Sequence, residues 1–461
     1  MEEKRTTLDE LRETAAELVK ERRFGKLREV LTVNEPADVA AFLSEAGESD
    51  ERLLPIIFRV LPKELAAETF VEMDSGEQEL LINAFSDREL KDVIDELFVD
   101  DAVDIIEEMP ANVVKRILKH TDPETRNSIN QILRYPKDSA GSIMTTEYVT
   151  LRPDMTVSES FDKIRRTGVD KETIYICYVT NPKRQLLGLV SVRDLLLSPY
   201  NTTIESIMEQ NIISVATHED KEEVARKFDK YDFISLPVVD NEYRLVGIVT
   251  FDDAIDVIRE ENTEDIQKMG AIQPSEENYF KTSAVMHAKN RILWLLFLML
   301  SATVTGSIIE RYESAFTAVP ILVSFIPMLT GTGGNCGSQS SAMIIRGLAL
   351  GEINSRDILR VILKEFAVAL MVGVLLAAVN AVRIFIMYRG DDPIFLSLVT
   401  GLSLIGTVII AKILGGTLPI LAKMCRLDPA LMASPLITTI VDTCSITIFF
   451  NVALFIMSVM M

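Results

Sequence analysis

Five long apolar segments in the carboxyl-terminal part of the chain constrain its fold more than any other feature. They lie near residues 291–309, 318–345, 359–388, 394–422 and 432–460. Each is long enough to cross a hydrocarbon core of about 30 Å. Unpaired backbone groups are costly in hydrocarbon, so the segments are expected to be helices. The sequence therefore predicts a multidomain membrane protein with an α-helical transmembrane domain of five helices at 290–461.

Basic residues near the ends of these segments predict the orientation in the membrane. They precede the first segment and flank the second-to-third and fourth-to-fifth connections: Lys289, Arg291, Arg346, Arg356, Arg360, Lys364, Lys423 and Arg426. By the positive-inside rule these connections are cytoplasmic. The opposite loops, 310–319 and 388–393, carry mixed or acidic charge. We expect a multi-pass protein of the plasma or inner membrane, with its amino terminus cytoplasmic and its carboxyl terminus extracytoplasmic.

The charge of the chain is divided unevenly between its two parts. Residues 290–461 hold 9 Asp/Glu and 11 Lys/Arg, and the remaining 59 and 36 give residues 1–289 a net charge of −23. Such a surface repels nucleic acid and attracts cations. The four cysteines show no CxxC pairing and the three histidines are scattered, which argues against a disulfide framework or a thiolate metal site.

Residues 1–135 repeat short helical phrases that are punctuated by proline and acidic residues. Examples are "EPADVAAFL" and "LPKELAAETFVEM", each with apolar residues at helical spacing and an acidic first turn. The amino terminus has no continuous apolar core and is not a signal peptide. The sequence predicts a cytosolic, all-α superhelical domain of stacked short helices.

An internal duplication follows at 136–258. "GSIMTTEYVTLRPDM" from Gly141 is echoed by "ESIMEQNIISVATHE" from Glu205, and "LLGLVSVRDLL" by "LVGIVTFDDAI". Each copy predicts strands and helices in an α/β unit. The pair resembles tandem CBS domains over about residues 139–258, a module that commonly binds adenine nucleotides. An acidic helix in 259–289 then links this region to the membrane.

The stretch "TGTGGNCGSQS" at 330–340 lies at membrane depth. We expect these glycines to break or bend the second span, so that Gly334, Asn335 and nearby backbone line a wet pathway. The alternative is close helix packing through small residues.

Asp442 lies near the middle of the last apolar segment, among Thr438, Thr439 and Thr443. A carboxylate at membrane depth is costly and indicates function, although a structural bond to a neighbouring helix is the alternative. The threonines form a hydrophilic stripe suited to a hydrated cation. Oxygen ligands and retained water favour Mg²⁺ over zinc or copper.

The glycine-rich stretch, the "DPALMASPLITTIVD" run, the CBS pair and the linking "TEDIQKMGA" together resemble the MgtE family of magnesium channels and transporters. The resemblance runs over essentially the whole chain. It implies a homodimer in the lipid bilayer with a pore between protomers, and an intracellular sensor that closes the pore when magnesium is abundant. An odd number of spans also favours pairing of protomers.

The resemblance further implies which carboxylates do this work. The pore acid is Asp442, with Asn335, Gly334 and Thr439 nearby. The regulatory carboxylates match at Asp100, Asp104, Asp220, Glu222, Asp232, Asp253, Asp256, Glu261, Glu264, Asp265 and Asp428. Facing carboxylates repel until a divalent ion bridges them, so domain closure would follow ion concentration. The alternative is a solvated acidic surface.

Other classes of function remain open at this point. The pathway could serve manganese, cobalt or nickel, or another ion, although an anion pore needs basic groups that the spans scarcely offer. No P-loop, catalytic triad or histidine metal motif is present, so enzymatic activity is not expected. Asp194 in "SVRDLL" is where CBS modules often contact a ribose, which suggests that ATP binds there.

Overall fold

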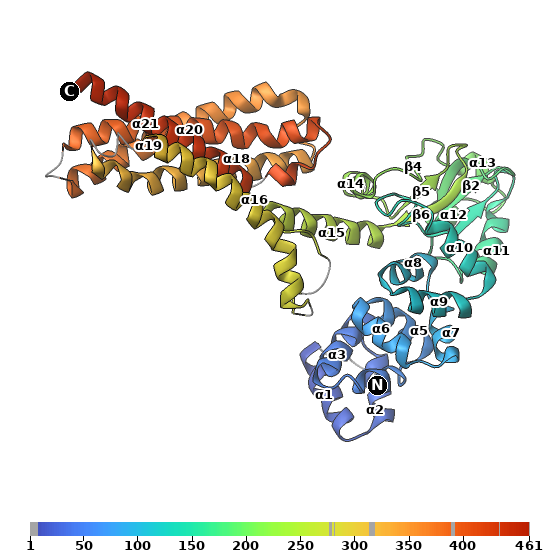
Figure 1. Ribbon diagram of the computed structural model, residues 1–461. Helices are drawn as coiled ribbons and strands as arrows, with labels where there is room; N and C mark the ends of the chain where they lie inside the picture. The colour runs from blue at the N-terminus through green and yellow to red at the C-terminus, as the bar shows by residue number, and fades with distance from the viewer. Residues whose placement is uncertain are drawn as a thin grey trace. The chain divides into compact units, whose positions relative to one another are not determined.

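A computed structural model describes residues 8–275, 279–280, 282–312, 319–388, 392–432 and 434–460 of the 461-residue chain. The described chain forms two compact units, residues 1–258 and 259–461. Figure 1 shows the elements of each unit.

Short helices fill the amino-terminal part of the first unit and stack in succession along the chain (Figure 1). Several of these helices start with a capping residue. Ser86 and Glu89 form a reciprocal capping box at α7, and the Asp122 side chain accepts hydrogen bonds from backbone N–H groups at the start of α10. Their apolar faces share one core with the second copy of the repeated unit. The helices are α1 (Leu8–Lys20), α2 (Phe24–Thr32), α3 (Pro36–Ser49), α4 (Leu53–Phe58), α5 (Lys63–Val71), α6 (Ser75–Ala84), α7 (Asp87–Ile94), α8 (Val99–Glu108), α9 (Ala111–His120) and α10 (Pro123–Ile132).

Two matching three-stranded sheets follow, which confirms the duplication. In each, the first strand pairs parallel with the second and the second antiparallel with the third. The first copy holds β1 (Tyr148–Leu151), α11 (Val157–Thr167), β2 (Thr173–Thr180), β3 (Leu186–Ser191) and α12 (Val192–Leu197). The second holds α13 (Ile204–Ile207), β4 (Val215–Ala216), α14 (Lys221–Tyr231), β5 (Ser235–Val239), β6 (Leu245–Thr250) and the first part of α15 (Phe251–Met269).

The repeated S-I-M and Leu-x-Gly phrases hold the two copies together. A Cβ at Gly247 in β6 would lie within 3 Å of Met144 from the first copy, and one at Gly188 in β3 within 3 Å of Met208 from the second. Thr145 also forms a bridge with Ile248, and Leu189 with Glu209. Glycine is favoured at both positions because a Cβ would also lie 2.8 Å from the Thr145 carbonyl oxygen or 3.0 Å from the Glu209 carbonyl oxygen, and backbone cannot move aside as a methionine side chain can.

The second unit is a set of long helices (Figure 1). They are α16 (Ala284–Arg311), α18 (Ile326–Ala349), α19 (Ile358–Met387), α20 (Pro393–Met424) and α21 (Ser434–Met460), with short 3-10 helices η1 (Pro320–Phe325), η2 (Ser355–Asp357) and η3 (Pro429–Met432). Helix α18 packs against α20 and α21, and α19 packs against α20. Most side chains of α16 are exposed within the protomer.

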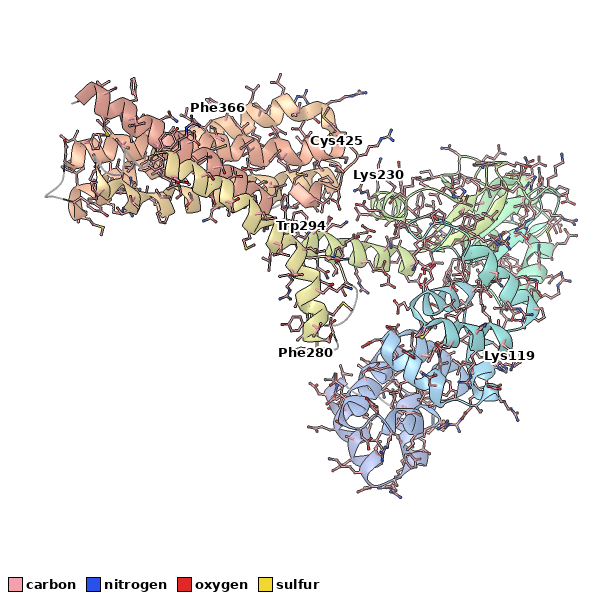
Figure 2. All side chains as sticks on the ribbon, viewed as in Figure 1. Lys119, Lys230, Phe280, Trp294, Phe366 and Cys425 are labelled. Carbon is pink, nitrogen blue, oxygen red and sulfur yellow. The ribbon has the colours of Figure 1, made fainter. Side chains whose placement is uncertain are left out.

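Among the described residues, four helices are long and apolar enough to cross a membrane: Ala284–Arg311, Ser355–Met387, Pro393–Met424 and Pro429–Val459. Figure 2 labels Trp294 on α16 and Phe366 on α19, two helices with many exposed apolar side chains. Helix α18 is not among the four, because glycine and hydroxyl residues replace apolar ones along it. The predicted count of five spans is therefore not confirmed. Parts of the two loops at 310–319 and 388–393 lie outside the described residues.

The expected break in the glycine-rich stretch is wrong. Residues 330–340 lie inside the continuous helix α18. A Cβ on Gly333, Gly334 or Gly337 would collide with side chains of α20 or α21. The glycines therefore let three helices approach closely, and this packing offsets the low helix propensity of glycine.

Candidate functional site

Asp442 lies in the third turn of α21 and is half-buried within one protomer. Its Oδ1 atom is buried and accepts no hydrogen bond from the described residues. Thr439 precedes it by three positions and so shares its helix face; the Thr439 hydroxyl donates to the carbonyl of Pro435 at 3.0 Å. A buried carboxylate oxygen without a donor is costly. It is suited to accept a bond from a cation or its water.

Small residues of α18 bring further oxygen atoms close to the helix that carries Asp442. A Cβ on Gly334 would meet Thr438, and one on Gly333 would meet Thr407, Val441 and Ser445. The Thr407 hydroxyl on α20 is also buried without a hydrogen-bond partner among the described residues. Asn335 follows Gly334 and is exposed on the protomer surface of α18. Hydroxyl-bearing residues of α20 and α21 therefore lie against the glycine face of α18, and α21 is the helix that carries Asp442.

A second set of acidic residues gathers inside the first unit. Asp100 at the start of α8 is 5% exposed, and its carboxylate lies with those of Glu147 and Glu172 so that one oxygen of each is within 4.8 Å of the others. The backbone N–H of Val99 donates to Glu147 Oε2 at 2.9 Å. The Oε2 atom of Glu172 is buried without a partner among the described residues. Asp100, Glu147 and Glu172, together with Asp101 and Asp253, are called the acidic cluster below.

Burial raises the pKa of every member of the acidic cluster, and repulsion from neighbouring carboxylates adds to this at Asp100, Asp101, Glu172 and Asp253. Burial, followed by repulsion from neighbouring carboxylates, raises the pKa of Glu172 to about 8 and that of Asp101 to about 7. Burial also raises the pKa of Asp253 to about 6, although the Thr250 hydroxyl partly opposes this. The pKa of Asp100 is raised by burial and by Asp253 and Glu172, and that of Glu147 by burial. A divalent cation relieves this repulsion, so the cluster is suited to hold one.

Other predicted regulatory carboxylates of the first unit are not gathered at this place. Asp104 is exposed on α8. Asp220 caps the start of α14, accepting from the backbone N–H of Glu222, while Asp232 ends the same helix at φ 54°. The two ends of an 11-residue helix are roughly 16 Å apart. Within one chain, Asp232 therefore cannot share an ion with Asp220 or Glu222.

The remaining predicted carboxylates lie on α15 and beside η3. Asp256, Glu261 and Asp265 lie along α15. Glu264 and Asp428 are joined by a lysine: Lys268 Nζ lies 2.6 Å from Glu264 Oε1 and 2.6 Å from Asp428 Oδ2. Burial by itself lowers the pKa of Lys268, but the hydrogen bonds to the carboxylates of Asp428 and Glu264 outweigh it, so the pKa is raised. The other Asp428 oxygen accepts from the backbone N–H of Ala430 at 2.8 Å.

Asp194 belongs to a capping box at the start of α12, where it accepts from the hydroxyl and backbone N–H of Ser191. A separate cavity of about 440 Å³ is lined by Lys163, Lys171, Arg184 and residues of β1. Burial and the neighbouring Arg152 and Arg166 lower the pKa of Lys163. Cationic side chains around a cavity are suited to an anionic group.

Sequence reasoning missed several of these residues. Asp101, Glu147 and Glu172 are separated by long stretches of chain, and only the fold brings them together. Lys268 lies one turn after Glu264, a spacing that predicts an ion pair on a helix. Lys412, in the apolar stretch "VIIAKILGG", carried the same signal of an intramembrane charge that identified Asp442.

Comparison with known families covers most of the chain. Residues 326–452 match the MgtE profile, described as a divalent cation transporter, and residues 34–138 match the MgtE intracellular N domain. Residues 140–199 and 204–260 each match a CBS domain.

Full-length relatives and solved structures agree with these matches. The magnesium transporter MgtE of Thermus thermophilus is 38% identical over 93% of this chain and 94% of its own. That of Bacillus subtilis is 32% identical over 97% of each. The crystal structure of the cytosolic domain of the Mg²⁺ channel MgtE in complex with ATP is 38% identical, with a TM-score of 0.50, over 53% of this chain and 99% of that one. The soluble part of a magnesium transporter is 28% identical, with a TM-score of 0.51, over 55% and 99%.

Proposed function

This chain belongs to the MgtE family of divalent cation transporters, and we propose that it carries Mg²⁺ across the plasma membrane and is gated by intracellular Mg²⁺. The resemblance to the MgtE family that the sequence motifs indicated is thereby confirmed. The family consists of transporters rather than enzymes. The observation that carries the proposal is the buried Oδ1 atom of Asp442, which has no hydrogen-bond partner among the described residues and lies on α21, the helix that packs against the glycine face of α18.

Asp442 acts in this proposal as the acid that attracts the permeating ion. A carboxylate and hydroxyls bind a hard cation that keeps several of its waters. Thr439, Gly334 and Asn335 belong to the same path: Thr439 by its shared helix face, Gly334 by the room it leaves at Thr438, and Asn335 by its exposed side chain. Manganese, cobalt and nickel have similar charge, so they are the competing cargoes.

Ion flux into proteoliposomes tests the transport proposal. Wild-type protein should take up Mg²⁺, and Asp442→Asn, which keeps the size of the side chain, should lose most of that flux while remaining folded. Each divalent cation is measured with and without a proton or sodium gradient, which separates a channel from coupled transport. Wild-type flux through a folded Asp442→Asn protein would remove Asp442 from the path.

Gating is proposed to use the acidic cluster and the carboxylates of α15. An ion shifts a conformational equilibrium only by its differential affinity for the two states. A hundredfold shift toward the closed state needs about 2.7 kcal/mol, which a few bridging ions can supply. The raised pKa values support a sensing role over a merely solvated surface, because they arise first from burial of the carboxylates and then from their repulsion, and a bound cation would offset both. The proposed regulatory set is completed, at contacts with other domains or the partner protomer, by Asp104, Asp220, Glu222, Asp232, Asp256, Glu261, Glu264, Asp265 and Asp428.

The proposed assembly is a homodimer in the membrane, with five spans in each protomer. Helix α18 is included as the fifth span because α20 and α21 cover its glycine face, so the small and polar residues that lower its hydropathy need not face lipid. The cytoplasmic amino terminus and extracytoplasmic carboxyl terminus follow from the basic connections. The exposed apolar side chains of α16 and α19 support contact with lipid or a second protomer. Cross-linking in native membranes, combined with labelling of single cysteines from each side, tests both points.

Nucleotide is proposed as a second regulator, because a related cytosolic domain was solved with ATP. Asp194 is the proposed ribose contact. Calorimetry compares the wild type with Asp194→Ala and Lys163→Gln. Loss of ATP binding in Asp194→Ala alone supports this place, loss in Lys163→Gln alone moves the ligand to the cavity, and no binding to the wild type rejects the proposal.

A further inference from the structure

Lys412 lies in the middle of α20 and is 6% exposed. Its ammonium group donates to Ser340 Oγ on α18 at 3.2 Å and lies 4.0 Å from Glu365 Oε2 on α19. An ammonium group is strongly hydrated in water, so its transfer to a buried place at membrane depth is costly. Such residues usually have a function or an essential partner.

The three side chains form one polar connection between three helices. The Ser340 hydroxyl donates to Glu365 Oε2 at 2.6 Å while its oxygen accepts from Lys412. Gly416 makes room for the Glu365 side chain, because a Cβ on Gly416 would lie 3.1 Å from Glu365 Cγ. The positive and negative charges therefore compensate each other in a small protein-lined space.

This connection lies one turn from a place where the backbones of α18 and α20 approach closely. A Cβ on Gly415 would overlap the backbone of Gly337. Gly337 in turn contacts Ile437 of α21. Ala411, next to Lys412, and Val441, next to Asp442, belong to the same apolar cluster. The position of α21 is thus determined through the α18–α20 crossing.

We propose that Lys412 and Glu365, joined through Ser340, are positioning residues that fix the α18–α20 crossing and keep the surroundings of Asp442 electrically neutral. The proposal rests on the proposed transport function. A lone ammonium in this space would oppose a cation at Asp442, whereas a lone carboxylate would add to the attraction and hold the cation too tightly. The compensated pair does neither, while it holds the helices that carry the path.

Single and double substitutions test the pair. Lys412→Met leaves the Glu365 charge, Glu365→Gln leaves the Lys412 charge, and the double variant leaves neither. Removing one partner of a buried pair is strongly destabilising, whereas removing both is often tolerated. We therefore expect both single variants to unfold at lower temperature in detergent, and the double variant to return close to the wild type.

The Mg²⁺ concentration at half-maximal flux separates positioning from a purely structural role. In folded protein, Glu365→Gln should raise it and Lys412→Met should lower it, each by severalfold, with Lys412→Arg and the double variant near the wild-type value. Unchanged half-maximal concentrations in both single variants would overturn the proposal. So would a double variant that is stable but inactive, because the charges themselves would then take part in transport.

If neither single variant folds, the double variant is used alone. Normal Mg²⁺ flux through the double variant supports the proposal, and absent flux through folded double variant overturns it. Liposomes that contain the wild-type protein, measured in the same series, test Mg²⁺ transport itself. A wild type without Mg²⁺ flux would reject the proposed function, while the stability comparison would still show whether the pair fixes the helices.

Discussion

The Lys268 ammonium bridges Asp428 and Glu264, 2.6 Å from an oxygen of each. Asp428 immediately precedes η3, and η3 leads into α21, which carries Asp442. A monovalent cation that belongs to the chain therefore occupies the space between two carboxylates proposed to bind Mg²⁺. This contact joins the carboxyl-terminal end of α15 to the segment that precedes α21.

Replacing Lys268 with Gln should make this contact depend on a divalent ion. Without the ammonium the two carboxylates repel, so we expect a stability loss of about 1 kcal/mol in chelator, as for a partly exposed ion pair. Added Mg²⁺ should then recover more stability than it does in the wild type. Thermal unfolding of the full-length protein in detergent, with and without Mg²⁺, measures both effects.

Lys268→Arg is the matched control for that experiment, because it keeps a cation at the same position. It should resemble the wild type in chelator. A Lys268→Gln protein with wild-type stability in chelator, or with no larger response to Mg²⁺, would show that the bridge contributes nothing to the contact.

The acidic cluster predicts that stability without Mg²⁺ falls as the pH rises. Folding raises the pKa of Glu172 to about 8 and that of Asp101 to about 7, so between the unfolded and folded pKa values the folded chain binds more protons than the unfolded one. The free energy of unfolding then decreases with pH across this window. In chelator, unfolding temperatures should be lower at about pH 8 than at about pH 5.5.

Mg²⁺ should remove most of this pH dependence, because the ion replaces the protons and its binding releases them. The gain in unfolding temperature on adding Mg²⁺ should accordingly be larger at the higher pH. An equal gain at both pH values would contradict binding of the ion at the acidic cluster.

Replacing Glu172 with Gln should stabilise the protein in chelator and weaken its response to Mg²⁺. The substitution removes a repelling charge and a ligand together, while the amide keeps a similar size. Glu205→Gln, at an exposed position outside the acidic cluster, is the control and should change neither quantity. Magnesium titrations followed by limited proteolysis compare the three proteins, and a Glu172→Gln protein that is less stable in chelator would argue against repulsion.

Some of the architecture was predictable because its signals are local. Apolar segments, acidic helix starts and the repeated S-I-M and Leu-x-Gly phrases each depend on neighbouring residues, and the two sheets confirm the duplication. Asp442 was identifiable because a lone carboxylate in an apolar segment is unusual. These patterns need no knowledge of how distant segments meet.

The acidic cluster was only partly predictable because it joins residues from separate elements. Asp100 and Asp253 came from the family resemblance, but Glu147 and Glu172 are brought to Asp100 only by the fold of the first CBS copy. Glycines in "TGTGGNCGSQS" were misinterpreted for a related reason. Whether a glycine breaks a helix or packs it depends on the neighbouring helix, which one sequence does not display.

The packing role of these glycines gives two substitutions on α18 with opposite expected signs. Gly331 is exposed and a Cβ there meets nothing within 4 Å, whereas a Cβ on Gly337 would lie 2.6 Å from Ile437 Cγ2. Gly331→Ala should be neutral or stabilise by up to about 1 kcal/mol, because alanine favours the helix. Gly337→Ala should destabilise by roughly 1–3 kcal/mol through overpacking.

Flux measurements extend this comparison to the path. Gly337→Ala forces α18 and α21 apart and so displaces the helix that carries Asp442, which should lower Mg²⁺ flux in folded protein. Gly331→Ala leaves this crossing unchanged and should keep wild-type flux. If both variants unfolded at the same temperature and transported equally, close packing at Gly337 would not position α21, and the glycines of α18 would need another explanation.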